Sequence, residues 1–412
     1  MHLAFFNRAY YPEVSATSQL LTELAEDLVR EYGCRVSVVA GLPLGAPTAS
    51  RRWRLVERDR HAGVEILRAR GTRWSKRTLV GRAANYLSYF ATACVAGLQL
   101  DRPDVVVAYT DPPIIGLAAW LAAHRARATL VIAYKDLFPE VARLVDGVRR
   151  PVIEWGLHRV NRFLLRRADR VLALGEAMRR RLVEEKGADP ATTVIIPDWA
   201  DGAAITPGLK DNAFSRAHGL ADRFVVMHAG NLGLSQNLSV LVEAAARLAD
   251  LPDLVVLFLG DGVAKPALEA DAVRRGLRNV RFLPFQPKGQ LTDVFAAADC
   301  FVVSLKPGLS GYIMPSKLYS ILAAGRPYVA AVDDGCDVAR ITRAHECGLL
   351  AHPGSPDEMA AQIRRLHEDR PRAEAMGCRA RQAAAAFDRP ISVRAYYDLC
   401  LMMTAHRSGG RR

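Results

Sequence analysis

Short, continuous apolar runs alternate with helical segments along the whole chain, and this alternation limits the fold more than any other feature. The runs at residues 105–108, 129–133 and 254–259 are apolar at almost every position. A strand with one face in water alternates apolar and polar side chains, whereas a parallel strand covered by helices on both faces is apolar throughout. The sequence therefore predicts α/β structure with doubly wound parallel sheets.

The alternation runs through two series. A chain of 412 residues is too long for one ordinary core. A first series of predicted strands ends at residues 194–196, a Pro- and Gly-containing linker follows at 197–208, and a second series starts at 224–230. We therefore expect a first domain at residues 1–200 and a second at 201–389. No strand follows the last helical pattern, so we expect a helix within 390–412 to pack back onto the first domain.

The segment at residues 314–327 is predicted to form the helix of a β–α–β unit. Ser316 is in position to cap the start of the helix, and Lys317 lies beside it. A free helix start with an adjacent ammonium favours an anion, phosphate above all. Gly325 and Pro327 mark the end of the helix, and an apolar strand follows at 328–332.

Polar side chains follow several predicted strands of the first domain. Glu13 lies in the loop after the first strand, and Lys135 and Asp136 follow the strand at 129–133. Loops at the carboxyl ends of parallel strands form the ligand site in such sheets. Asp136 could take a proton from an acceptor hydroxyl. The first loop lacks Gly-x-Gly-x-x-Gly, so a nicotinamide dinucleotide fold is not supported.

The net charge of +13 is concentrated in two parts of the first domain. Basic residues crowd the segment 51–82, which includes Trp53 and Trp74, and the segment 149–170, which includes Trp155. Arginine interleaved with tryptophan suits an anionic membrane surface or a lipid diphosphate. No recognition motif for nucleic acid accompanies this charge, so nucleic acid is not expected as a partner. A solvated basic face is the remaining interpretation.

Other features indicate a cytoplasmic protein. The chain starts directly on an apolar strand without a basic leader, and no apolar run reaches the length of a membrane span. The seven cysteines form no Cys-x-x-Cys pair and have no ligand-like histidine spacing. We therefore expect reduced thiols, no metal and no bound cofactor. Together with the basic, tryptophan-containing segments, these features lead us to expect peripheral association with the inner face of the cell membrane.

Several motifs together resemble glycosyltransferase family 4, in particular the bacterial enzymes of capsule, colanic-acid and O-antigen assembly. They are the loop at 11–13, the linker Pro197-Asp198-Trp199-Ala200-Asp201, Gly230-Asn231-Leu232-Gly233, Gly260-Asp261-Gly262, and Pro315-Ser316-Lys317 followed by Ala323-Ala324-Gly325-Arg326-Pro327. The resemblance implies a GT-B fold, in which two tandem Rossmann-like domains face each other across a cleft. It also implies a retaining glycosyltransferase that usually needs no metal.

The same resemblance assigns substrates and site residues. The second domain would hold a nucleotide-diphosphate sugar, typically a UDP sugar, and the first a polyprenyl-diphosphate-linked or other saccharide acceptor. Expected donor-binding residues are Gly230, Asn231, Gly233, Gln236, Gly260, Phe285, Tyr312, Pro315, Ser316, Lys317 and Ser320. Expected acceptor-binding residues are Glu13, Ser15 and Lys135, and expected catalytic residues are Asp136 and Lys317.

The sequence departs from the family pattern at four donor positions. Asn231 and Gln236 stand where an arginine and a lysine commonly contact the diphosphate, and Tyr312 and Ser320 stand where two glutamates are usual. A serine cannot accept hydrogen bonds from two ribose hydroxyls as a carboxylate does. Two alternatives stay open: a non-hydrolysing UDP-sugar 2-epimerase, and a non-catalytic basic membrane-binding protein with a degenerate donor site. The epimerase needs carboxylates and histidines that converge on the sugar, and the second domain has few of them.

Overall fold

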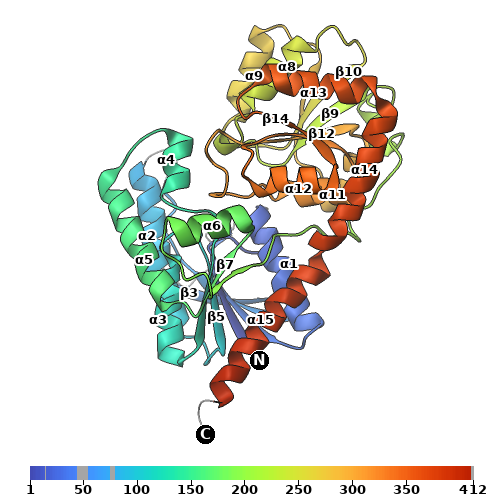
Figure 1. The fold of residues 1–412 in the computed structure, drawn as a ribbon. Coiled ribbons are helices and arrows are strands. Elements are labelled where there is room, and N and C mark those ends of the chain that lie inside the picture. Colours follow the sequence, from blue (N-terminus) through green and yellow to red (C-terminus); the bar gives the residue numbers. More distant parts are fainter. Residues whose placement is uncertain (14, 44–53, 75–78, 410–412) are drawn as a thin grey trace. The chain divides into compact units, whose positions relative to one another are not determined.

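The computed structural model describes residues 1–13, 15–43, 54–74 and 79–409. The chain divides into two compact units. Unit 1 comprises residues 1–139, 149–197 and 392–412, and unit 2 comprises residues 140–148 and 198–391. The first unit therefore includes the C-terminal segment of the chain. Each unit is an α/β domain built on its own sheet (Figure 1).

The described part of unit 1 contains one eight-stranded sheet with the strand order β3-β4-β2-β1-β5-β6-β7-β8. All neighbours are parallel except β3 and β4, which form an antiparallel hairpin. The strands are β1 (His2–Phe6), β2 (Arg35–Gly41), β3 (Val56–His61), β4 (Val64–Ala69), β5 (Val105–Tyr109), β6 (Thr129–Ala133), β7 (Arg170–Ala173) and β8 (Thr193–Ile195).

Helices cover both faces of this sheet (Figure 1). They are α1 (Ala16–Arg30), α2 (Leu79–Leu98), α3 (Ile115–Ala126), α5 (Pro151–Arg167), α6 (Glu176–Glu184) and α15 (Arg389–Gly409). On one side, α3 packs against both α2 and α5. On the other side, α15 packs against the sheet. The Tyr109 hydroxyl donates to the hydroxyl of Tyr396 in α15 at 3.3 Å, and Tyr397 stacks on Tyr32.

Unit 2 contains a parallel six-stranded sheet with the order β11-β10-β9-β12-β13-β14. Its strands are β9 (Phe224–Ala229), β10 (Leu254–Leu259), β11 (Val280–Leu283), β12 (Cys300–Ser304), β13 (Tyr328–Ala331) and β14 (Gly348–Ala351). Its helices are α4 (Glu140–Asp146), α7 (Ala213–Ala217), α8 (Ser239–Arg247), α9 (Lys265–Arg274), α10 (Leu291–Ala296), α11 (Lys317–Ala323), α12 (Asp337–His345), α13 (Pro356–Glu368) and α14 (Arg370–Ala384), with short 3-10 turns η1 (Leu234–Gln236), η2 (Lys288–Gln290) and η3 (Ala385–Phe387).

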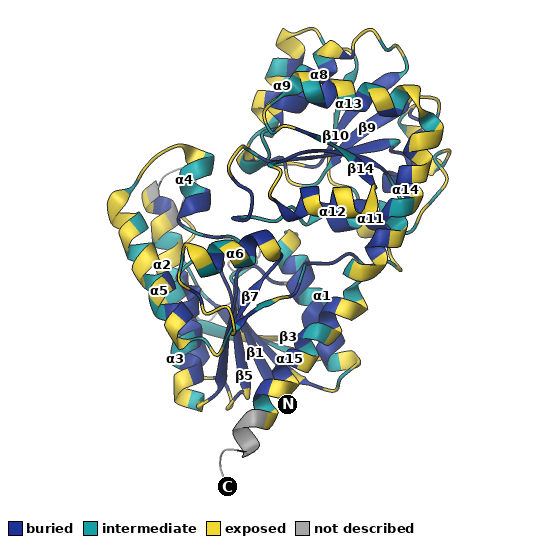
Figure 2. Ribbon diagram, viewed as in Figure 1, coloured by how far each residue is buried: buried dark blue, intermediate teal, exposed yellow. Residues whose placement is uncertain are grey.

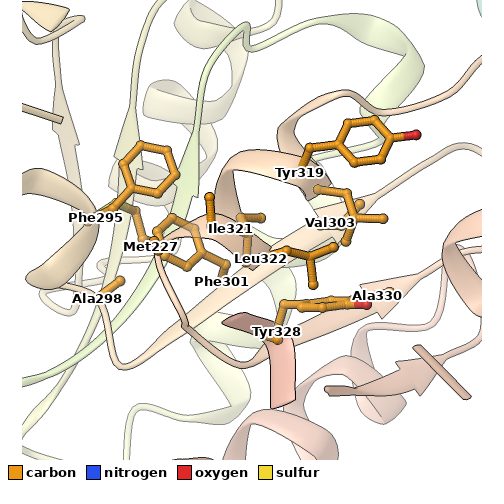
Figure 3. Packing of buried hydrophobic residues seen from close by; sticks show 14 of the residues in the cluster. Met227, Phe295, Ala298, Phe301, Val303, Tyr319, Ile321, Leu322, Tyr328 and Ala330 are labelled. Carbon is orange, nitrogen blue, oxygen red and sulfur yellow. The ribbon is translucent and has the colours of Figure 1, made fainter. Parts of the chain in front are cut away.

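The helix α11 is anchored in the core of unit 2. Its side chains Tyr319, Ile321 and Leu322 are buried and pack with residues of β12 and β13 (Figure 3). The chain leaves the helix through Gly325, whose φ of +64° is the left-handed conformation that glycine adopts without strain. Core packing therefore fixes the position of Lys317, the first residue of the helix.

The predicted tandem α/β domains with parallel sheets are confirmed. The strands at 129–133 and 254–259 have the predicted bounds. The strand β3 was not predicted, because its residues Val56–His61 are mostly charged and none of them is buried. Such charge is usual on a strand at the edge of a sheet, where it discourages pairing with other chains.

Candidate active site

The carboxyl ends of three neighbouring strands of unit 2 meet in a glycine-lined loop cluster. The backbone N–H of Gly230, after β9, donates to the Leu259 carbonyl at 2.8 Å, and the N–H of Gly260, after β10, donates to the Leu283 carbonyl at 2.8 Å. A Cβ atom on Gly260 would lie 2.0 Å from the Gly230 carbonyl oxygen. Because φ of Gly260 is +140°, the position also excludes L side chains on conformational grounds. Close backbone packing therefore requires this glycine.

The loop after β9 is also fixed by close packing around glycines. A Cβ atom on Gly262 would lie 2.4 Å from the Leu232 carbonyl oxygen, and one on Gly233 would lie 2.8 Å from Nδ2 of Asn231. The N–H of Leu232 donates to the Asp261 carbonyl at 2.9 Å. The predicted donor residues Gly230, Asn231, Gly233 and Gly260 are thus brought together on one surface.

Lys317 joins this cluster from α11. Its Nζ lies 2.8 Å from Nε2 of His228, the penultimate residue of β9. A Cβ atom on Gly230 would lie 3.9 Å from Nζ of Lys317, so the glycine leaves room beside the ammonium. Burial lowers the pKa of Lys317 to about 7. Burial, and then the charge of Lys317, lower the pKa of His228 well below its usual range, so the imidazole is neutral.

The predicted cap at Ser316 is wrong. Ser316 has helical backbone angles, φ −59° and ψ −22°, and its side chain makes no capping hydrogen bond. A capping side chain needs an extended backbone to reach back to the first turn. The carbonyls of Pro315 and Ser316 instead accept from the N–H groups of Leu318 and Tyr319. Because α11 also has only seven residues, an anion at this place would be held by the charge of Lys317 rather than by the helix end.

Two further predicted donor residues border the cluster. Gln236 lies beside His228, and its Oε1 atom is buried without a hydrogen-bond partner among the described residues. The ring of Phe285 is 49% exposed, and its Cε1 lies 3.3 Å from the place of a Cβ on Gly260. A flat, half-exposed aromatic ring beside these glycine loops is suited to stack on a nucleotide base.

The positions that replace the usual glutamates differ in exposure. Ser320 is half-buried on α11, one helical turn after Lys317 and on the same side of the helix. Tyr312 is buried, and its N–H donates to the Leu309 carbonyl at 3.0 Å. Of Ser320 and Tyr312, only Ser320 lies on α11 with Lys317.

In unit 1, the predicted residues gather at the carboxyl ends of β1, β5 and β6. The Arg8 guanidinium lies 3.9 Å from the Glu13 carboxylate and 3.2 Å from the Asp111 carboxylate. These two carboxylates raise the pKa of Arg8 although burial opposes them. Ser15 accepts a hydrogen bond from the N–H of Ser18 at 3.3 Å and caps α1.

Lys135 and Asp136 lie at the end of β6. Nζ of Lys135 lies 4.5 Å from the centre of the Tyr109 ring, and the residue is buried. Asp136 is half-buried, and its backbone carbonyl accepts a hydrogen bond from the Thr110 hydroxyl at 3.4 Å. A carboxylate at this edge of a parallel sheet can receive a proton from a bound hydroxyl group.

The structure adds three residues that the sequence did not assign to the site: His228, Arg8 and Asp111. His228 and Asp111 both lie at or beyond the end of a buried parallel strand, which is the only signal that pointed to them. Within the described ranges, no three His, Cys, Asp or Glu side chains converge as a metal site would require. All seven cysteines are free thiols. No helix in the described residues is long and apolar enough to cross a bilayer.

Two protein-family models match the chain, one in its first half and one in its second half. Residues 16–199 match the glycosyl transferase 4-like domain, and residues 210–383 match glycosyl transferases group 1. WcaI of Escherichia coli strain K12, which is named as a colanic acid biosynthesis glycosyl transferase, is 26% identical over 88% of this chain and 91% of its own length. WbjE of Pseudomonas aeruginosa, named as a glycosyltransferase, is 26% identical over 65% of this chain and 67% of its own length.

The fold is also similar to solved structures. The crystal structure of Anabaena Alr3699/HepE in complex with UDP-glucose superimposes with a TM-score of 0.74, at 18% identity, over 97% of this chain and 99% of the other. The two family matches, each confined to one part of the chain, favour glycosyl transfer over the epimerase and over a non-catalytic basic module. The chain belongs to glycosyltransferase family 4 and is a glycosyltransferase with the GT-B fold.

Proposed function

We propose that this enzyme transfers a sugar, with retention of anomeric configuration, from a UDP sugar to a lipid-linked saccharide in cell-surface polysaccharide assembly. The observation that carries the proposal is the position of Nζ of Lys317, which lies 2.8 Å from Nε2 of His228 and beside the glycine loops at the carboxyl ends of β9 and β10. The name of WcaI and the UDP-glucose complex of Alr3699/HepE support the same donor class and pathway.

The chemistry of donor cleavage explains why the site needs Lys317. As the bond to the sugar breaks, the leaving nucleoside diphosphate gains negative charge. A fixed cation in a water-poor site stabilises that charge more in the transition state than in the bound substrate. Asn231 and Gln236 are neutral, so Lys317 carries a larger share of the stabilisation than in relatives with a basic pair.

The neighbouring residues fit the rest of a UDP sugar. The exposed ring of Phe285 would stack on the base, and the Ser320 hydroxyl would make one hydrogen bond to the ribose. The backbone at Gly230 and Gly233 would approach the diphosphate closely because no side chain intervenes. In unit 1, Glu13, Ser15 and Lys135 would bind the acceptor, and Asp136 would receive the proton of its hydroxyl group.

The surface of unit 1 supports a lipid-linked acceptor. At the start of α5, Val152 is 82% exposed and Trp155 is 65% exposed, and the Arg159 guanidinium lies 5.4 Å from the centre of the Trp155 ring. Arg162 and Arg166, at helical spacing from Arg159, are exposed as well. Figure 2 shows exposed residues along α5. Because α5 links parallel β6 to β7, it starts near the carboxyl end of β6, which is the edge that holds Asp136.

Apolar side chains that insert and arginines that bind anionic headgroups are the usual features of a peripheral membrane surface. Trp74 is another exposed tryptophan in the basic segment 51–82. Other residues of that segment, Arg51, Arg52, Trp53, Lys76 and Arg77, lie outside the described residues. We therefore propose that the enzyme works on the cytoplasmic face of the cell membrane, where its acceptor would be embedded.

A donor screen tests the function. The enzyme is mixed with a panel of UDP sugars and GDP sugars and with polyprenyl-diphosphate-linked saccharides in vesicles, and the lipid products are resolved by mass. We expect one UDP sugar to add a single sugar to the acceptor. Transfer from GDP sugars alone would overturn the assignment of the base, and transfer only to water-soluble acceptors would overturn the lipid-linked acceptor.

A further inference from the structure

His228 links two structural elements of the donor site. The residue is fully buried, at 0% exposure, in β9. Its Nδ1 lies 3.3 Å from the Val302 carbonyl oxygen in the neighbouring β12, and its Nε2 lies 2.8 Å from Nζ of Lys317 in α11. Both ring nitrogens therefore have a partner, and these partners determine where the ring carries its hydrogen.

The Val302 carbonyl can only accept a hydrogen bond, so this contact is made by the tautomer that carries its hydrogen on Nδ1. Nε2 then carries a lone pair that faces Lys317. Both the ammonium and the neutral amine of a lysine have N–H groups that can donate to this lone pair. A protonated His228 would instead direct an N–H at the lysine, which an ammonium cannot accept and which adds charge repulsion between the two side chains. A neutral ring with its hydrogen on Nδ1 is therefore the one state of His228 that suits both the ammonium and the neutral amine of Lys317.

The surroundings provide no negative charge for Lys317. The groups that face the pair are the Val302 carbonyl from β12, the backbone of Asn231 and the side chain of Gln236 from the loop after β9, and each is neutral. Burial alone lowers the pKa of Lys317, with no contribution from a carboxylate among the described residues. The pKa of about 7 means that the lysine is neutral in an appreciable part of the molecules at physiological pH.

We propose that His228 is a positioning residue that holds Lys317 beside Gly230 in either protonation state, and that Lys317 takes up one proton when a nucleoside diphosphate binds. This inference rests on the proposed function and deepens it. The proton comes from the solvent and bonds to the lone pair of Nζ, so the amine becomes an ammonium as the diphosphate oxygens arrive. The neutral imidazole keeps its proton on Nδ1 throughout.

The direction of the pH dependence follows from linkage. Without donor, Lys317 has a pKa of about 7, and a neighbouring diphosphate raises this pKa because opposite charges favour the protonated form. Below pH 7 the lysine is already charged before the donor arrives, so the titration of Lys317 does not make the affinity for UDP depend on pH. Above pH 7 each binding event needs a proton, and the dissociation constant for UDP rises by about tenfold for each pH unit.

The test is calorimetric titration of the full-length enzyme with UDP between pH 6 and pH 9, in pairs of buffers that differ in ionisation enthalpy. We expect close to one proton taken up for each UDP bound at pH 8, and almost none at pH 6. UDP binding without proton uptake at pH 8 would overturn this inference and leave the proposed function intact. No binding of UDP at any pH would contradict the proposed function itself.

Variants of His228 test its role separately. His228→Phe keeps the ring volume but removes the acceptor for Lys317, so we expect the dissociation constant for UDP at pH 7 to rise by about tenfold or more. His228→Gln restores a side-chain acceptor and should recover most of that loss. If the melting transition shows that His228→Phe does not fold, the dissociation constants and pH profiles of His228→Gln and the wild type still test the role of His228. Equal dissociation constants and pH profiles for the folded variants and the wild type would show that His228 positions nothing.

Discussion

The carbonyl oxygen of Gly230 lies 2.0 Å from the point that a Cβ atom on Gly260 would occupy. Two strand ends of unit 2 therefore approach each other so closely that only glycine fits between them, and this contact shapes the loops around Lys317.

Gly260→Ala should strongly destabilise the enzyme. The new methyl group would collide with backbone, and φ of +140° is strained for alanine, so we expect a loss of about 2–4 kcal/mol in the free energy of unfolding. Urea denaturation measures it. Gly289→Ala is the matched control, because a Cβ there meets nothing within 4 Å. Equal losses in the two variants would contradict the close packing.

Lys317 should also make stability depend on pH. The unfolded lysine has a pKa of 10.5, whereas the folded one has a pKa of about 7. Between these values the unfolded state binds more protons, so the contribution of Lys317 to stability rises with pH, by at most about 1.4 kcal/mol per unit. Lys317→Met should therefore flatten the rise between pH 7 and pH 9 in urea denaturation. Parallel curves for the variant and the wild type would refute the lowered pKa of Lys317 in the folded state.

The exposed residues of α5 should hold the enzyme on anionic vesicles. Val152→Ser combined with Trp155→Ala removes two exposed apolar side chains, and we expect several-fold weaker sedimentation with phosphatidylglycerol vesicles. Leu209→Ser combined with Val263→Ser is the control, because both residues are equally exposed but lie in unit 2. Neutralising Arg73, Lys76 and Arg77 should weaken binding further. If none of these changes alters vesicle binding, the proposed membrane association is wrong.

Because α15 packs against unit 1, substitutions of two leucines in this helix should differ in their effect on the free energy of unfolding. Leu399 is 6% exposed and Leu401 is 46% exposed. Leu399→Ala removes a packed side chain and should cost about 2–4 kcal/mol of unfolding free energy. Leu401→Ala should cost less than about 1 kcal/mol. If both substitutions have the same effect in urea denaturation, α15 does not pack as described.

The fold could be predicted where local pattern and burial agree. Strands such as β6 and β10 are buried on both faces, so their residues are apolar throughout and their bounds are visible in the sequence. The edge strand β3 was missed because its exposed side chains can be charged without cost. Gly325 marked the end of α11 correctly because a left-handed residue is needed there.

The site was predictable only in part. The glycine loops and Lys317 each follow a buried strand, and parallel strands bring their carboxyl ends to one edge. The role of His228 was not visible, because it depends on a lysine 89 residues later in the chain and on the direction of both side chains. The expected cap at Ser316 failed for a related reason: a serine before a helix caps only if its own backbone is extended, which no sequence pattern determined here.

The rate of sugar transfer by Lys317→Ala tests the central claim most directly. The measurement compares turnover of the wild type, Lys317→Ala and Lys288→Ala with the donor and acceptor that the screen identifies. Lys288 is an exposed lysine of the same unit, so its variant controls for the loss of one positive charge. We expect turnover by Lys317→Ala to be at least about a hundredfold slower, since a preorganised group at the leaving diphosphate contributes about 3–4 kcal/mol. Its melting transition should stay cooperative, and turnover by Lys288→Ala should equal that of the wild type. A folded Lys317→Ala enzyme with near-normal turnover would contradict the central claim.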